Sequence, residues 1–123
     1  NDTVKTLLRD RGYQSARAVG GLAFTPYITV KGYEFDEFQV EAADLNSGVS
    51  LAQAKAEVDQ AIKYGGTIIF LIHAFVASSP GASSWQTSDF QALCDYIQVR
   101  EPQLTVLKYG EWFGGHTTPR RVR

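Results

Sequence analysis

The other predicted elements are arranged around the segment Gly65-Gly66-Thr67-Ile68-Ile69-Phe70-Leu71-Ile72-His73-Ala74-Phe75. Its two glycines are typical of a helix end, and an apolar run then continues without a break to His73. A short apolar run bounded by turn residues indicates a strand buried on both faces, as in parallel sheets that helices cover. Functional side chains in such sheets lie at the carboxyl ends of the strands, which is where His73 falls.

Length and composition predict one globular domain. The chain has 123 residues, of which 44% are hydrophobic and 20% charged, and this is enough for one modest core but not for two. The net charge of −1 creates no general field that would attract nucleic acid or an anionic membrane. No apolar run approaches the roughly 18 residues of a membrane span. We therefore expect neither a nucleic-acid partner nor a membrane span.

Hydrophobic periodicity predicts helices that alternate with strands. Apolar residues at helical spacing predict helices over residues 2–11, 50–64 and 87–97. Alternating or continuous apolar residues predict strands over residues 13–19, 37–43, 67–75 and 104–107, with a loop over 20–36 and a short turn or helix over 109–113. This order implies parallel pairing with right-handed crossovers, so the predicted fold class is α/β.

Particular residues at the helix ends and faces refine this prediction. Ser50 and Gln53 fit the capping-box pattern at the start of the second helix. Thr87 is expected to cap the third helix. Cys94, the single cysteine, is expected on the apolar side of that helix as a small core residue, and it excludes an intrachain disulfide.

His73 is the strongest candidate for a catalytic residue. An imidazole titrates near neutral pH, so His73 can act as a general acid or base. A structural histidine at the end of an apolar run is the alternative. His73 and His116 make no metal-binding pattern, because no i, i+4 pair or His/Asp cluster is present. The sequence also lacks a phosphate-binding glycine loop, a G-x-S-x-G motif and a C-x-x-C motif.

Charged residues near the predicted strand ends are the next candidates. Arg17 lies in an otherwise small and apolar strand, where a charge needs a partner. Glu41 or Asp44, near the end of the next strand, would supply that partner. Either carboxylate would equally orient His73, as a second group orients the base in many sites. Arg17 is itself a candidate for a supporting role in catalysis or substrate binding, and a purely structural ion pair is the alternative.

Two aromatic residues are candidates for binding sugar. Trp85 lies in the loop after the His73 strand, where its ring would form a platform for a sugar. Packing of the loop is the alternative for Trp85. Phe75, which ends the opening stretch, is the second candidate for contact with substrate.

The order of these segments resembles the C-terminal half of the polysaccharide deacetylases of the NodB-homology type (carbohydrate esterase family 4). Residues 65–73 look like the last motif of that family, a hydrophobic strand that ends in Leu-x-His. The other segments follow in the family's order: residues 7–17 resemble its helix, Gly-aromatic and Ala-Arg segment, residues 50–62 its helix before the His strand, and residues 87–97 and 104–112 its closing helix, strand and tryptophan-containing end. The likeness covers residues 1–113, and residues 114–123 are expected to be a flexible basic tail.

The resemblance implies a distorted (β/α) barrel that removes N- or O-acetyl groups from chitin-like, peptidoglycan or other surface polysaccharides. In that family a divalent metal, commonly zinc, polarises the acetyl carbonyl and the attacking water. An aspartate acts as the base, and the histidine that matches His73 protonates the leaving amine. An acidic residue orients that histidine, and Asp44 or Glu41 is the nearest match here. The polymeric substrates imply an extracytoplasmic location.

The motifs that carry the base and the metal ligands in that family have no match in this sequence. It contains neither a Thr-Phe-Asp-Asp-Gly-like motif nor His-x-x-x-His. The resemblance therefore implies that this chain alone binds no metal and is inactive, with the N-terminal half of the barrel or a second copy of the chain as its partner. The alternatives are a non-catalytic half-barrel that self-associates or sits in a larger assembly, such as a virion or cell surface, and an unrelated small carbohydrate-binding domain.

Overall fold

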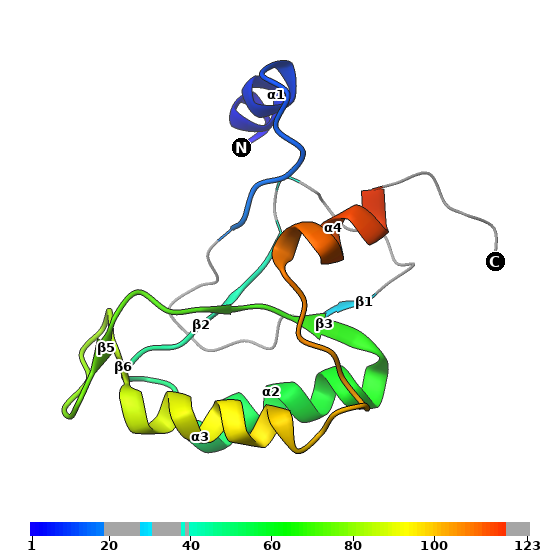
Figure 1. Ribbon diagram of the computed structural model, residues 1–123. Helices are drawn as coiled ribbons and strands as arrows, with labels where there is room; N and C mark the ends of the chain where they lie inside the picture. The colour runs from blue at the N-terminus through cyan, green and yellow to red at the C-terminus, as the bar shows by residue number, and fades with distance from the viewer. Residues whose placement is uncertain (19–27, 31–37, 39, 118–123) are drawn as a thin grey trace.

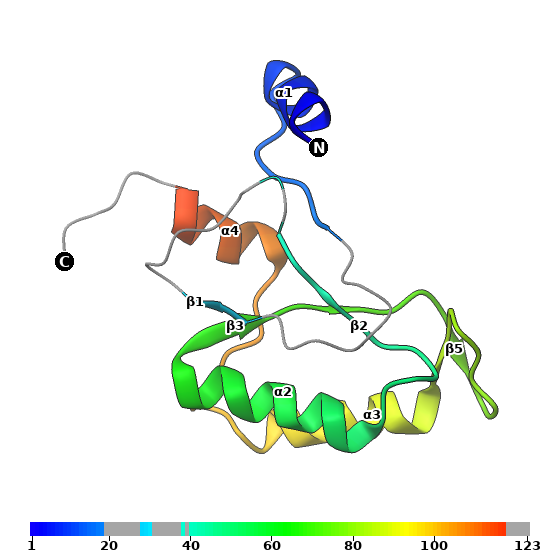
Figure 2. The ribbon, with the colours of Figure 1, turned by 180° about the vertical axis from the view of Figure 1, so that it is seen from behind.

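Helices and short strands alternate along the chain in a computed structural model, which describes residues 1–18, 28–30, 38 and 40–117. The elements are α1 (Asp2–Asp10), β1 (Ile28–Val30), β2 (Ala43–Asp44), α2 (Leu51–Tyr64), β3 (Gly66–Ile68), β4 (Phe70–Leu71), β5 (Phe75–Val76), β6 (Trp85–Gln86), α3 (Thr87–Gln98) and α4 (Tyr109–Thr117). Figure 1 and, from behind, Figure 2 show α2 and α3 side by side on one side of the strands, with α1 at the opposite end.

The strands form three two-stranded sheets within the described part of the chain. β2 pairs with β4 in parallel, as the alternating order predicted. β5 also pairs with β6 in parallel, but β6 lies in the segment 76–86 that was predicted as a loop, so this pair was not predicted. β1 pairs with β3 antiparallel, and it lies inside the segment that was predicted as a loop. The β-branched run Ile28-Thr29-Val30 was a signal for this strand. A half-barrel built on these pairs stays a prediction.

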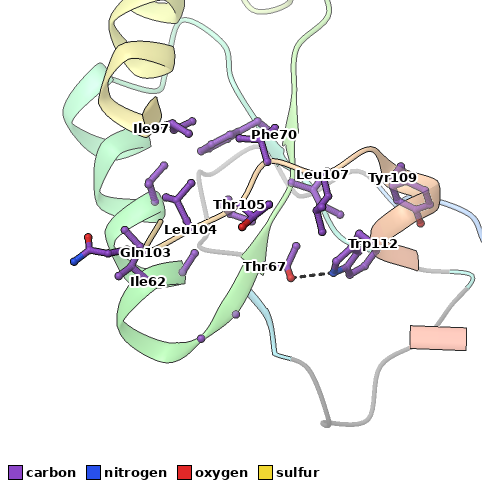
Figure 3. A pocket seen from close by; sticks show the side chains of 17 residues that line it. Ile62, Thr67, Phe70, Ile97, Gln103, Leu104, Thr105, Leu107, Tyr109 and Trp112 are labelled. Carbon is purple, nitrogen blue, oxygen red and sulfur yellow. Dashed lines mark hydrogen bonds between the residues drawn. The ribbon is translucent and has the colours of Figure 1, made fainter. Parts of the chain in front are cut away.

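The central stretch is less buried than its apolar run predicted. It is divided into β3, β4 and β5, and the side chains of residues 66–72 are all half-buried. The predicted burial on both faces is therefore wrong. The predicted strand over residues 104–107 is also wrong, because this segment runs past the stretch without joining a ladder. An open groove of about 580 Å³ remains, with Ile68–Phe70 and Gln103–Leu107 among its lining (Figure 3).

The ends of the two long helices depend on local hydrogen bonds. At the start of α2 the Ser50 hydroxyl accepts from the Gln53 amide at 3.1 Å, and the Gln53 side chain accepts from the Ser50 amide at 2.8 Å, so the capping box is confirmed. Gly65 ends α2 with a φ of 68°, a conformation that favours glycine. Thr87 is not the cap of α3; it is the first helical residue, and its hydroxyl donates to the Val76 carbonyl.

The core lies where α2 and α3 face the end of β2 and the start of β6. Its buried members are Leu45, Val49, Ala54, Val58, Trp85 and Leu93. Trp85 is 1% exposed, and its Nε1 donates to the Val49 carbonyl at 2.9 Å. Cys94 was predicted to face this core but is exposed, because the adjacent Leu93 takes the inward position and one residue turns a helix by about 100°.

A polar contact also joins the two long helices. The Tyr96 hydroxyl of α3 donates to the Asp59 carboxylate of α2 at 2.7 Å, and this hydrogen bond raises the pKa of Tyr96. Arg100 lies over the Tyr96 ring and approaches Asp59 at 3.4 Å. Because Asp59 is more than half exposed, this cluster fixes the alignment of the helices more than it stabilises them.

The two terminal helices differ from the predictions in opposite ways. α1 forms as predicted, with the Asn1 side chain accepting from the Val4 amide, but it has no buried residue. α4 confirms the predicted helix after residue 109 and continues to Thr117, into the segment predicted as a tail. Residues 118–123 lie outside the described residues, as do residues 19, 37 and 39 of the predicted strands.

Glu57 is a charged residue buried on α2, and the helical spacing of apolar residues did not predict its burial. Its side chain is 3% exposed, and Oε2 has no hydrogen-bond partner among the described residues. Burial raises the pKa of the Glu57 carboxyl, because the charged form is poorly solvated there. The folded state therefore holds the Glu57 proton more tightly than the unfolded chain does.

Replacement of Trp85 by Phe should destabilise the chain by about 2 kcal/mol. Trp85→Phe leaves a small cavity and leaves the buried Val49 carbonyl without its donor. Urea unfolding of both proteins measures the difference. Val99→Ala, at a highly exposed position, is the control and should change stability by less than about 0.5 kcal/mol. A Trp85→Phe effect as small as that of the control contradicts the assignment of Trp85 to the core.

The stability of the chain should fall with rising pH relative to a Glu57→Gln variant. A raised pKa stabilises the fold fully below the unfolded-state pKa, and this contribution is lost as the pH rises through the folded-state pKa. Urea unfolding between about pH 4 and pH 7 should therefore show the variant gaining on the wild type. Glu41→Gln controls for the loss of an exposed negative charge. A pH-independent difference between the Glu57→Gln variant and the wild type contradicts this account.

Candidate functional site

His73 lies two residues beyond the carboxyl end of β4, before β5 begins. Its side chain is exposed, and no hydrogen bond or ion pair joins it to another residue in the described part of the chain. An exposed imidazole at a strand end can reach a bound molecule and exchange protons with it. This geometry therefore permits His73 to act as a general acid or base, and it shows no contact that would require a structural histidine among the described residues.

The parallel ladder between β2 and β4 brings Asp44 to the same edge as His73. Asp44 is the register partner of Leu71, and two backbone bonds hold the pair: the Ala43 amide donates to the Ile69 carbonyl at 2.8 Å, and the Leu45 amide donates to the Leu71 carbonyl at 2.9 Å. Because the strands run in the same direction, their carboxyl ends lie together. Asp44, the last residue of β2, and His73, which follows β4, therefore lie at the same end of this strand pair.

The carboxylate of Asp44 has one oxygen without a donor. Oδ2 accepts from the Asn46 side chain at 3.3 Å, whereas Oδ1 is buried and has no hydrogen-bond partner among the described residues. A buried carboxylate oxygen without a donor is costly, so this position is suited to a donor that arrives with substrate or moves into place. An imidazole N–H is such a donor, and catalytic hydrogen bonds often tighten only when substrate binds.

Glu41, the other candidate for orienting His73, lies outside this pairing. It precedes β2 by two residues, its side chain is exposed, and it makes no hydrogen bond to another described residue. Asp44 is half-buried and belongs to the ladder that also contains the His73 strand. The geometry thus favours Asp44 over Glu41.

Arg17 lies in an isolated bridge, so no strand forms over residues 13–18 of the predicted strand 13–19, and the predicted ion pair of Arg17 is absent among the described residues. A parallel bridge joins Arg17 to Val40, with the Ala18 amide donating to the Val40 carbonyl at 2.8 Å. The Arg17 side chain is exposed, and no ion pair links it to Glu41 or Asp44 in the described ranges. The prediction was wrong because it assumed a buried charge, whereas an exposed guanidinium is solvated and needs no partner.

The two aromatic candidates have opposite environments. Trp85 is buried in the core, so its ring presents no face to a sugar and the packing alternative is the one observed. Phe75 is 47% exposed. One side of its ring meets Phe90 of α3, with the ring centroids 4.7 Å apart. Of the two, only Phe75 can contact a bound molecule.

The described residues do not fit the zinc ion that the resemblance implies. Among them, no group of three or more His, Cys, Asp or Glu side chains is arranged to hold a metal ion. Catalytic zinc sites use three protein ligands, so a single histidine with Asp44 nearby is insufficient. Proton transfer is the chemistry that His73 and Asp44 can supply among the described residues.

The groove beside β3 is a feature that sequence reasoning missed. Figure 3 shows its lining from α2, the β3 strand, residues 103–107 and α4, with the Trp112 Nε1 donating to the Thr67 hydroxyl at 3.0 Å. Val106 and Leu107 at its rim are large exposed apolar residues. Residues 104–107, which line the groove, were predicted as a strand because of their apolar character.

No described helix is both long and apolar enough to cross a membrane. Comparison of the chain with protein-family models, curated proteins and solved structures found no match. The likeness of residues 65–73 to a deacetylase motif therefore stays a prediction made from the sequence.

Proposed function

We propose that this chain carries the proton-donating part of a metal-dependent polysaccharide deacetylase, which removes acetyl groups from N-acetylglucosamine-type or other surface glycans. The observation that carries the proposal is the pairing of β2 and β4, which brings Asp44 and His73 to one strand edge. The Leu-x-His pattern at the end of that strand adds the reaction class. An exposed His73 suits a polymeric substrate, which cannot enter a closed cavity.

Each of the two residues has a defined role in the proposal. His73 in its protonated form donates a proton to the sugar nitrogen as the bond between that nitrogen and the acetyl carbon breaks. Asp44 accepts a hydrogen bond from the other imidazole N–H through Oδ1, the oxygen without a donor among the described residues, and this bond orients the ring and stabilises its charge. Asp44 is a positioning residue, and His73 is the catalytic acid.

The base and the metal have to come from outside the described residues. We propose that the remaining half of the barrel, or a second copy of the chain, supplies them. Large apolar side chains in contact with solvent support such an interface: Val4 and Leu7 on α1, and Val106 and Leu107 beside the groove. An extracytoplasmic location, where polymeric glycans occur, belongs to the same proposal.

A second candidate function is a non-catalytic module that self-associates or sits in a larger assembly. The observation that favours it is α1, which has an apolar side and no buried residue. Val4 and Leu7 are about half exposed, and a helix with such a face gains stability when another surface covers it. In this candidate the glycan, if bound, is not hydrolysed.

In the complete metal-bearing protein, His73→Ala should lower acetate release from chitooligosaccharide by about 100-fold or more, because the leaving amine loses its proton donor. Steady-state rates at saturating substrate measure the loss in kcat. KM should change little, since His73 is not needed for binding. An unchanged kcat returns His73 to a structural role and removes the catalytic proposal.

Asp44→Asn and Glu41→Gln form a matched pair that tests which carboxylate orients His73. Both changes replace a carboxylate by an amide of the same shape. Asp44→Asn should lower kcat about tenfold or more, because an amide cannot stabilise the imidazolium as a carboxylate does. Glu41→Gln should stay within about twofold of the wild type. Equal effects, or the reverse order, contradict the assignment of Asp44.

The isolated chain should release no acetate and bind no zinc at stoichiometry, which acetate assay and metal analysis after dialysis measure. Stoichiometric zinc or activity in the isolated chain contradicts the division of the site. The non-catalytic module, the second candidate function, makes a different prediction. The double substitution Val4→Glu and Leu7→Glu should abolish an oligomer seen by sedimentation, whereas His73→Ala should change no function of the complete protein.

A further inference from the structure

Phe75 is a large apolar side chain in contact with solvent beside His73. One residue separates them, so their Cα atoms lie within about 7 Å of each other. A single exposed apolar residue is ordinary on a protein surface. The argument for a site therefore depends on how firmly Phe75 is held and on what its free side can contact.

Two contacts hold Phe75 in place. Its ring lies against Phe90 of α3, with centroids 4.7 Å apart and an angle of 43° between the planes. Its backbone is the register partner of Trp85, and the Trp85 amide donates to the Ala74 carbonyl at 2.9 Å. Trp85 belongs to the buried core. Phe75 is therefore braced by α3 and anchored to the core, and about half of its surface remains free.

We propose that Phe75 is a platform for the apolar face of a pyranose ring in an N-acetylated glycan. The C–H groups on one face of a pyranose are attracted to the negative face of an aromatic ring, and a ring that is already held loses little entropy on binding. The proposal rests on the proposed function for the place of bond cleavage. The sugar on Phe75 is the neighbour of the sugar whose nitrogen His73 protonates, so the substrate class is an oligomer and not a single sugar.

The 123-residue chain, titrated with a β-1,4-linked N-acetylglucosamine tetramer and followed by heteronuclear NMR, tests this platform. The expected result is a set of shifts around residues 72–77 and a dissociation constant that Phe75→Ala raises about fivefold or more. Phe75→Trp should bind at least as tightly as the wild type. Tyr64→Ala, which removes another exposed aromatic residue, is the matched control and should leave the dissociation constant unchanged.

Phe75→Leu keeps the proposal testable if the alanine variant unfolds. Leucine can still cover Phe90 but has no aromatic face, so it should keep the wild-type urea midpoint within about 0.5 M and weaken tetramer binding. Wild-type binding by Phe75→Leu, or no tetramer binding by the wild-type chain at millimolar concentration, overturns the platform. Thus a failed platform leaves the kcat effect of His73→Ala intact, and a failed acid leaves the binding effect of Phe75 intact.

Discussion

The parallel ladder between β2 and β4 is the constraint on which the site depends. It contains the register pairs Ala43–Phe70 and Asp44–Leu71, and the bonds from the Ala43 amide to the Ile69 carbonyl and from the Leu45 amide to the Leu71 carbonyl flank them. A slip of one residue would turn every side chain of β2 to the opposite face. Leu45 would then leave the core, and Asp44 would lose its place beside the end of the His73 strand. The burial of Leu45 thus fixes the register that the site needs.

The two long helices support this ladder through the core. α2 and α3 pack on Trp85 of β6 and on Leu45 through Val58 and Leu93, and a polar contact through Tyr96 and Asp59 also joins the two helices. The groove beside β3 stays open, and α1 buries nothing in the described part of the chain. Asp44, His73 and Phe75 lie on the segments that join this core, before Leu45 and before Trp85.

Local patterns in the sequence predicted the helices well, because caps and helical spacing act over a few residues. The capping box at Ser50 and the glycine at the end of α2 are examples. Features that depend on distant neighbours were predicted poorly. Trp85 lies in a loop-like stretch, but a carbonyl 36 residues away makes it part of the core. Arg17 and Cys94 were placed by the character of their own segments, although both are exposed. The position of His73 followed from strand geometry, whereas the open oxygen of Asp44 required the structure.

In the deacetylase that we propose, Asp44 and His73 act as one unit. A double-mutant cycle in that complete, metal-bearing protein measures whether they do. The kcat for acetate release is measured for the wild type, Asp44→Asn, His73→Ala and the double variant. If Asp44 works through His73, the double variant is as slow as His73→Ala alone, because Asp44 has nothing left to orient. If the two losses multiply, the residues act independently and the central claim is wrong.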